Sequence, residues 1–306
     1  MVLLSQFEIV VANGDVAPVS VSSDVAMRAD AKRLFNEGDK LYRQGTAESL
    51  RKSIEKWQEA LKLYQQIGDK KLQAFILNNI GFVYDSLGDK QQALKFYNQS
   101  LPLLIEVRDK AQQAVTLNNI AFVYNSLGDK QQALKFYNQS LPLLIEVGDK
   151  EKQAIAFNNI GSVYNSLGDK QQALKFYNQS LPLTIEVGDK AQQAVTLNNI
   201  GSVYNSLGDK QQALKFYNQS LPLLIEVGSK EKQASILNNI GAIYSSLGDK
   251  QQALKFYNQS LPLTIEVGDK TGQANTLSLC RLQRLQRMQI KPLTLLSFST
   301  TYRVVT

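Results

Sequence analysis

A repeat of 40 residues runs through most of the chain, and this periodicity constrains its fold more than any other feature. The 14-residue string KQQALKFYNQSLPL recurs five times without change, starting at Lys90, Lys130, Lys170, Lys210 and Lys250. A more variable string separates the copies, as in KAQQAVTLNNIGSVYNSLGD over residues 190–209. Units of this size cannot bury their apolar surface alone, so stability must come from the packing of each unit on its neighbours.

Both halves of the repeat are predicted to be amphipathic helices. In the variable half, apolar or small residues recur at the spacing of one helix face, at Leu197, Ile200, Gly201, Tyr204 and Leu207. The constant half shows the same spacing at Ala213, Phe216, Tyr217, Ser220 and Leu224. Gly208 can adopt the left-handed conformation that ends a helix, and Asp209 can cap the next one. Because both loops are short, consecutive helices are expected to be antiparallel neighbours.

The same residues carry a resemblance to a known family. Its signature positions are filled in register by Leu197, Ile200, Gly201, Tyr204, Gly208, Ala213 and Tyr217. Over about residues 31–289 the chain resembles tetratricopeptide repeat proteins. Within that family it is similar to the long-repeat subclass of the spindle-orientation adaptor rich in Leu-Gly-Asn repeats, to kinesin light chain and to bacterial arrays associated with CHAT domains. The resemblance implies an all-α fold, a right-handed α-solenoid (superhelix) of antiparallel helix pairs.

The second half of the repeat departs from the family pattern at two positions. Ser220 and its copies occupy the place of a small Ala. The family's late proline is missing, and an earlier one recurs inside the predicted helix, at Pro102, Pro142, Pro182, Pro222 and Pro262. Proline removes one hydrogen bond and clashes with the carbonyl four residues back, so a bend is predicted in each of these helices.

The repeat pattern divides the chain into four parts. Residues 1–30 are predicted to be an irregular N-terminal segment, either a loose terminus, which we favour, or the last strand of an upstream domain. Residues 31–268 should form six helix pairs, of which the first is atypical, as terminal repeats usually are. Residues 269–290 are predicted to be a solvating helix with a basic outer face, and residues 291–306 an irregular tail.

Charge and composition exclude several classes of function. The net charge is +7, but residues 270–306 alone carry +6, so the array up to residue 269 is nearly neutral and nucleic-acid binding is not expected. The chain has no His and one Cys, which excludes a disulfide framework, most zinc sites and His-dependent nucleophiles. No phosphate-binding glycine motif occurs. We therefore expect no catalytic residue, no metal and no cofactor.

The expected location is the cytoplasm of a bacterium, without membrane attachment. No apolar run reaches the roughly 18 residues needed to span a bilayer. The opening MVLLSQFEIVV lacks a basic start, a long apolar stretch and a small-residue cleavage site, and so is a poor signal peptide.

The first helix of each pair is expected to line the inner surface of the solenoid. On a helical wheel, the polar positions of this helix fall within an arc of about 100° opposite the core face. The candidate ligand-binding amides are Asn78, Asn118, Asn158, Asn198 and Asn238, their neighbours Asn79, Asn119, Asn159, Asn199 and Asn239, and Asn125, Asn165 and Asn205. Because amides both donate and accept hydrogen bonds, such a ladder can hold the main chain of an extended peptide. Alternatively, they cap neighbouring backbone or face water.

Two aromatic residues make the N-terminal part of this surface more apolar. Phe82 and Phe122 give way to Ser or Ala in later repeats, and they are predicted either to anchor a ligand side chain or to add a packing contact. The carboxylate clamp that some family members use requires Lys or Arg in the groove. This chain has Val195, Asn198 and Asn199 there, so binding of an acidic chaperone C-terminus is not expected.

The leading functional prediction is a non-catalytic scaffold that binds a peptide segment of a partner protein in the groove. The first alternative is the sensor arm of a truncated CHAT-type caspase-like protease. Its catalytic His and Cys would have to lie on sequence that is missing here, because the chain has no His. The second alternative is weak end-to-end self-association, since the terminal units resemble the internal ones.

Overall fold

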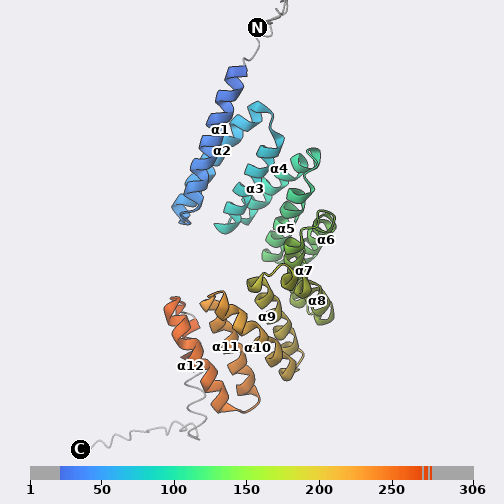
Figure 1. The fold of residues 1–306 in the computed structure, drawn as a ribbon, viewed down its shortest axis with the longest axis vertical. Coiled ribbons are helices and arrows are strands. Elements are labelled where there is room, and N and C mark those ends of the chain that lie inside the picture. Colours follow the sequence, from blue (N-terminus) through green and yellow to red (C-terminus); the bar gives the residue numbers. More distant parts are fainter. Residues whose placement is uncertain (1–20, 271, 275, 278–306) are drawn as a thin grey trace, which may run out of the picture. The chain divides into compact units, whose positions relative to one another are not determined.

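The computed structural model describes residues 21–270, 272–274 and 276–277, and these residues form helices joined by short turns, with no strand among them (Figure 1). The helices are α1 (Val21–Tyr42), α2 (Ala47–Ile67), α3 (Lys70–Ser86), α4 (Lys90–Glu106), α5 (Lys110–Ser126), α6 (Lys130–Glu146), α7 (Lys150–Ser166), α8 (Lys170–Glu186), α9 (Lys190–Ser206), α10 (Lys210–Glu226), α11 (Lys230–Ser246) and α12 (Lys250–Glu266). They pack in consecutive pairs, which confirms the prediction of an all-α solenoid.

The helices fall into two compact units that divide within α5, between Asn119 and Ile120. The first unit contains α1 to α4 and the N-terminal part of α5, and the second contains the remainder of α5 and α6 to α12. In the second unit, each pair packs on the next, and α7 also contacts α9 directly.

Most helix junctions use the predicted stop and start signals. At the junction of α3 and α4, Gly88 has a φ of 86°, and the Asp89 carboxylate accepts a hydrogen bond from the backbone N–H of Gln92 at 3.1 Å. Two junctions deviate. Arg108 has a φ of 56° at a position where the other repeats have Gly, and Ser229 precedes α11 without a side-chain capping bond.

Helix α1 begins at Val21, earlier than the repeat pattern predicts for the first pair. The residues before the repeat are irregular by that pattern, but they include good helix formers and place Asp24 in the first turn, where the helix dipole favours a negative charge. The remaining residues of the predicted N-terminal segment, residues 278–306 and the basic stripe of Arg281, Arg284 and Arg287 lie outside the described residues.

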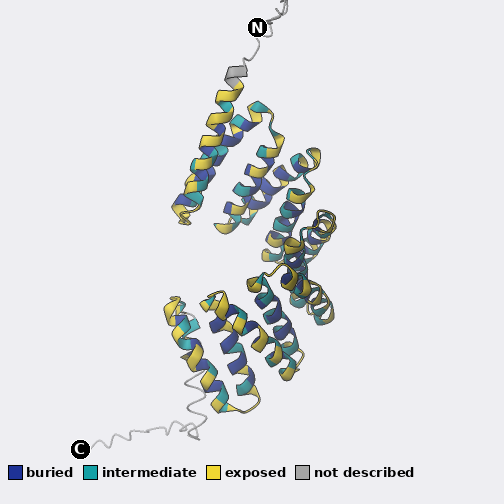
Figure 2. Cartoon of the chain, viewed as in Figure 1, coloured by how far each residue is buried: buried dark blue, intermediate teal, exposed yellow. Residues whose placement is uncertain are grey.

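The core of each unit lies between the helices, on the faces that the periodicity predicts (Figure 2). In the first unit, Trp57 is 2% exposed, and its indole Nε1 donates a hydrogen bond to the carbonyl of Phe35 at 3.2 Å. In the second unit, Gly201 lies against the ring of Tyr217, and a Cβ added there would stand 2.8 Å from the ring atom Cε1. Glycine at this signature position therefore permits the close approach of the paired helices.

The second helices of the later pairs, α4, α6, α8, α10 and α12, contain both departures from the family pattern. Helix α10 continues through Pro222 to Glu226. Ser220 is completely buried, and its hydroxyl donates to the carbonyl of Ala194 in α9 at 2.7 Å. The serine thus adds a hydrogen bond between paired helices where the family has a small apolar residue.

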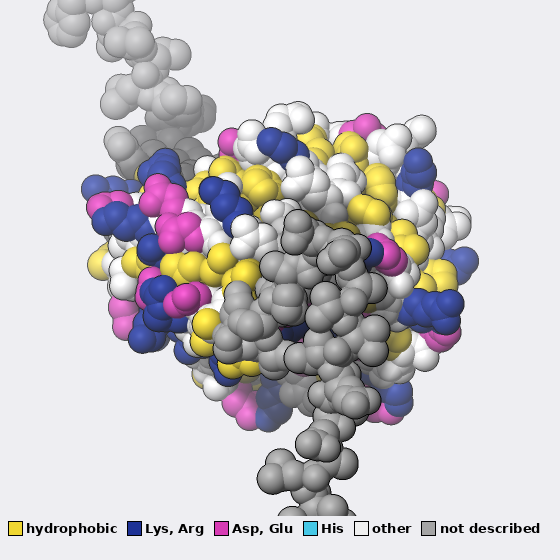
Figure 3. Space-filling view, turned by 90° about the horizontal axis from the view of Figure 1, so that it is seen from above, with side chains coloured by type: hydrophobic (Ala, Val, Ile, Leu, Met, Phe, Trp, Pro, Cys, Tyr) yellow, Lys and Arg dark blue, Asp and Glu magenta, His cyan; other side chains and the backbone are white. Residues whose placement is uncertain are grey.

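Within the described residues, no helix is both long enough and apolar enough to span a membrane. In the same residues, no cluster of His, Cys, Asp and Glu has the arrangement of a metal site. Lysines, arginines and carboxylates are interspersed on the face shown in Figure 3.

Candidate functional site

The first helices of the pairs, α1, α3, α5, α7, α9 and α11, are here named the A helices, and the second helices are named the B helices. In the second unit, we define the A face as the solvent-accessible side of α7, α9 and α11. Its residues are half-buried or exposed and comprise Ile155, Asn159, Ser162, Val195, Asn198, Asn199, Ser202, Ser235, Asn239 and Ala242. This surface is polar, with small and aliphatic side chains between the amides.

The predicted amides do not all face solvent. Asn158 is only 4% exposed. Its Nδ2 donates to Oγ1 of Thr196 at 2.7 Å, and its Oδ1 accepts from Nδ2 of Asn199 at 3.0 Å. These bonds join α7 to α9, so Asn158 is used for packing between repeats and is not available to a ligand.

The first unit contains the same arrangement. Asn78 is buried and donates to the hydroxyl of Thr116, while Nδ2 of Asn119 donates to Oδ1 of Asn78 at 3.2 Å. At the far end of the second unit, Nδ2 of Asn238 donates to Oγ1 of Thr276 at 3.0 Å. For Asn78, Asn158 and Asn238, the structure therefore corrects the prediction of a ligand-binding role in favour of the alternative, internal hydrogen bonding.

Asn118 and Asn198 differ from these three. The side-chain oxygen of Asn118 is buried without a hydrogen-bond partner among the described residues. Asn198 is half-buried, and its side chain forms no hydrogen bond to any residue that the structure describes. The reason for the difference is visible in the sequence, because the position of the threonine partner is Ala156 in α7 and Ile236 in α11. Bonded and unbonded amides thus alternate along the array.

The third predicted set, Asn125, Asn165 and Asn205, lies at the C-terminal ends of the A helices. Their Oδ1 atoms accept hydrogen bonds from the ammonium groups of Lys130, Lys170 and Lys210, at 2.6, 2.6 and 2.5 Å. Each bond joins the end of an A helix to the start of the following B helix. These amides stabilise the turn between paired helices, and the prediction that they bind a ligand is not supported by their contacts.

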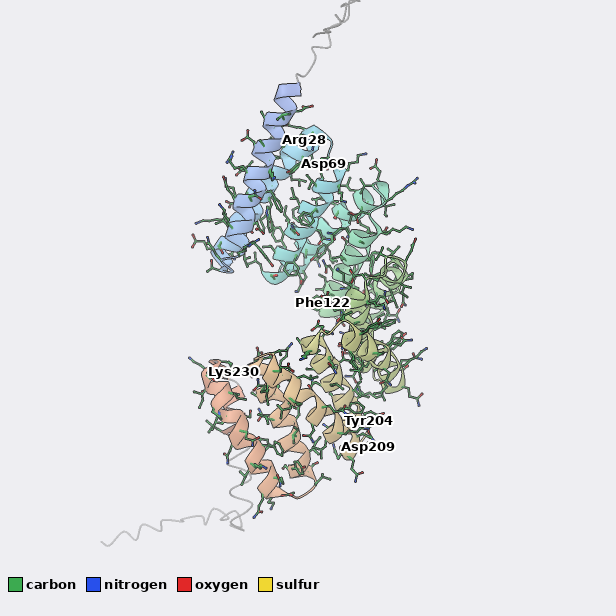
Figure 4. All side chains as sticks on the ribbon, in the orientation of Figure 1. Arg28, Asp69, Phe122, Tyr204, Asp209 and Lys230 are labelled. Atoms are coloured by element: carbon green, nitrogen blue, oxygen red, sulfur yellow. The ribbon has the colours of Figure 1, made fainter. Side chains whose placement is uncertain are left out.

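The second amides of the pairs remain closer to the surface. Asn79, Asn159 and Asn239 are half-buried, as are Asn119 and Asn199, which donate to the buried amides described above. The two aromatic candidates are exposed, Phe82 at 44% and Phe122 at 45%. Figure 4 labels Phe122. Phe82 contacts Tyr42 edge-on, with ring centroids 6.4 Å apart, which is the packing contact that the sequence offered as the alternative use of this residue.

A pocket of about 210 Å³ opens on the A face between α9 and α11. It is lined by Ala194, Val195, Asn198, Leu224, Lys232, Ser235 and Ile236. The sequence placed Val195 and Asn198 in the groove, but it did not identify the pocket. Leu224 reaches it from a B helix, and only the packing of three helices brings these residues together.

Lys232, the charged residue of the pocket, lacks the N-cap carboxylate that pairs with the corresponding lysine of α7. In α7, Lys152 forms an ion pair with the N-cap carboxylate of Asp149 at 2.5 Å. In α11, the corresponding lysine is Lys232, but the N-cap residue is Ser229. Lys232 forms no ion pair within the described part of the chain. The replacement of Asp by Ser is the sequence signal that could have identified this site.

The tetratricopeptide repeat profile matches residues 46–106, 112–186 and 192–266, which is more than half of the chain. The chain belongs to the tetratricopeptide repeat family. In this tetratricopeptide repeat protein, the signature residues have the burial that the family pattern requires, since Leu197, Ile200, Ala213 and Tyr217 are at most 4% exposed.

No curated protein matches the sequence. Several solved structures share the fold at low identity. BtubC from P. vanneervenii is 20% identical, with a TM-score of 0.58 over 80% of this chain and 92% of that one. Aspartyl phosphate phosphatase F from Bacillus subtilis is 12% identical, with a TM-score of 0.65 over 89% and 82%. A Rap protein complexed with competence and sporulation factor is 12% identical, with a TM-score of 0.58 over 87% and 79%.

Proposed function

We propose that this tetratricopeptide repeat protein is a non-catalytic scaffold that binds an extended segment of a partner protein along the A face. The observation that carries the proposal is the pocket between α9 and α11, which has an unbonded amide, Asn198, beside an apolar wall. An amide with free donors and a free acceptor can bond to both main-chain groups of a peptide, whatever its side chains.

The size of the pocket supports a peptide over a small molecule or cofactor. Pockets for such ligands occupy roughly 300–1,000 Å³, whereas this one has about 210 Å³. A volume of this size suits one aliphatic side chain. Because the pocket opens on a longer surface of half-buried amides and serines, the rest of the peptide would extend along that surface.

Within this proposal, Asn198 is the amide that bonds to the partner, assisted by the half-buried Asn159 and Asn239 on the same face. Phe122, also in the second unit, would contact an apolar side chain of the segment, because its ring is 45% exposed. The near-neutral array supports a protein partner in the cytoplasm, and neither nucleic acid nor a membrane is proposed as a ligand.

The sensor-arm and self-association alternatives rest on the sequence alone, and no contact among the described residues favours either. The Rap protein solved with competence and sporulation factor supports the proposal by analogy, since that protein of the same fold binds a second molecule.

The test is a fluorescence titration of the full chain with a library of N-acetylated, C-amidated decapeptides. We expect binding of selected extended peptides, and Asn198→Ala should weaken it by about 2-fold to 10-fold for each lost hydrogen bond. Asn218→Ala is the matched control, because this asparagine is exposed on α10, a B helix, and should not matter. Absence of binding, or equal loss in both variants, would contradict the proposal.

A further inference from the structure

We infer that the pocket between α9 and α11 selects a partner segment in which an aspartate or glutamate lies next to an aliphatic residue, with Lys232 binding the carboxylate. The inference rests on the proposed function and adds the side-chain chemistry that the partner must have. It follows from three features of the pocket, which are an unpaired cation, an apolar wall and an unbonded amide.

The cation is available because of a single residue difference between repeats. Lys152 and Lys232 occupy the same position in α7 and α11, three residues after the N-cap. The N-cap carboxylate of Asp149 neutralises Lys152, whereas Ser229 has no charge to offer Lys232. An exposed ammonium beside a groove attracts a complementary carboxylate from a ligand.

The neighbouring lysine does not share this property. Lys230, at the first position of α11, is paired with Glu266 of α12, and the same pairing links Lys150 to Glu186 and Lys190 to Glu226. The charge of Lys230 is therefore compensated within the array. Lys232 is the charged residue of the pocket lining that can select a ligand by its charge.

The apolar residues that line the pocket determine which ligand side chain can bind beside the carboxylate. Ala194, Val195, Leu224 and Ile236 form an apolar surface, and Leu224 is itself only 2% exposed. An aliphatic side chain of the ligand would cover this surface and exclude water from it. The amide of Asn198 would then hold the adjacent main chain, which sets the distance between the aliphatic and the acidic residue.

A side-chain carboxylate is a better occupant than a free C-terminus. The pocket lining contains one cation, Lys232, and the neighbouring residues of the A face, Val195, Asn198 and Asn199, are uncharged, so no second cation is placed to hold a free terminal carboxylate. The A face also extends on both sides of the pocket, across α7 and along α11, so a bound segment can continue past it. We therefore assign the pocket to an internal acidic residue.

The experiment uses the full chain and the same blocked decapeptides, whose acetylated and amidated ends carry no terminal charge. Positions are scanned with Glu against Gln and with Leu against Ser. Wild-type protein should prefer Glu next to Leu, and Lys232→Ala should lower affinity for the Glu peptide by about 2-fold to 5-fold while leaving the Gln peptide unchanged. Lys152→Ala is the control and should change neither.

Ser229→Asp tests the role of the Lys232 charge in a variant whose loss of Glu preference cannot be attributed to misfolding. The new carboxylate should cap α11 and pair with Lys232, as Asp149 does with Lys152. The melting temperature should therefore stay the same or rise, while the preference for Glu is lost as in Lys232→Ala.

Each outcome decides between the two proposals. Equal binding of Glu and Gln peptides by the wild type would overturn the inference and leave the peptide-binding proposal in place. The inference would also fail if Lys152→Ala had the effect expected of Lys232→Ala, or if Ser229→Asp strengthened binding of the Glu peptide. Absence of binding by any peptide would overturn both.

Discussion

Replacement of Asn158 by Ala should destabilise the protein by about 2 kcal/mol, whereas the same replacement at Asn198 should change its stability by less than about 0.5 kcal/mol. The two asparagines occupy the same position of two consecutive A helices in the second unit, α7 and α9. They differ in their contacts, because Asn158 makes two side-chain hydrogen bonds at a site 4% exposed and Asn198 makes none within the described residues.

The magnitude follows from these contacts. Each hydrogen bond contributes about 0.5–1.5 kcal/mol, so the loss of both costs roughly 1–3 kcal/mol. Truncation of a buried side chain adds to this cost, and the higher helix propensity of Ala offsets about 0.5 kcal/mol of it. Thr196 keeps its bond to the carbonyl of Gln192 at 3.0 Å, and Asn199, which loses its acceptor, is only half-buried and can bond to water instead. At Asn198, only the propensity gain applies.

The assay is urea unfolding followed by circular dichroism at 222 nm, with native-state hydrogen exchange to locate the effect. Asn158→Ala should lower the midpoint and speed exchange in α7 and α9. A double-mutant cycle with Thr196→Val measures the coupling directly. The reasoning is refuted if the two alanine variants unfold at the same urea concentration, or if the cycle shows no coupling.

Three further predictions concern a turn, an exposed aromatic ring and a buried tyrosine. Arg108→Gly should raise stability by about 0.5–1 kcal/mol, seen as a higher melting temperature, because Arg108 has a φ of 56° and Gly has no Cβ penalty there. Phe122→Ser should not lower the melting temperature, because the ring of Phe122 is 45% exposed and Ser occupies the equivalent position in α7 and α9. Burial raises the pKa of Tyr177 to about 12, so the contribution of Tyr177 to stability should be constant below pH 10 and fall as the pH rises from about 10 through 12, where only the unfolded phenol ionises. The difference in absorbance at 295 nm between the wild type and Tyr177→Phe would test this last prediction, and a difference that develops near pH 10 without unfolding would contradict it.

Much of the fold follows from the sequence, because the interactions that determine it are local. The positions of the helices depend on apolar spacing within a few residues, and their ends depend on adjacent Gly and Asp residues such as Gly88 and Asp89. The exact 40-residue period then requires each unit to pack on the next in the same way. These features predicted the paired helices and the buried face that contains Ile200 and Tyr217.

The candidate site was predicted less completely, because the availability of a side chain depends on residues far away in the sequence. The wheel position of Asn158 is the same as that of Asn198, and only the residue opposite each amide on the next A helix distinguishes them. That residue is Thr196 in one case and Ile236 in the other, about one repeat further along the chain. The 40-residue repeat gives both asparagines the same predicted position and therefore does not reveal this difference.

The sequence by itself determined that the protein is an array of capped, amphipathic helix pairs and that asparagines recur at the edge of the packing face. Only the tertiary structure decided which amides are used internally, where a pocket opens and that Lys232 has no counter-ion among the residues that the structure describes. The physical reason is that helix formation requires hydrogen bonds over four residues. The freedom of a surface group depends instead on the side chains that neighbouring helices place against it.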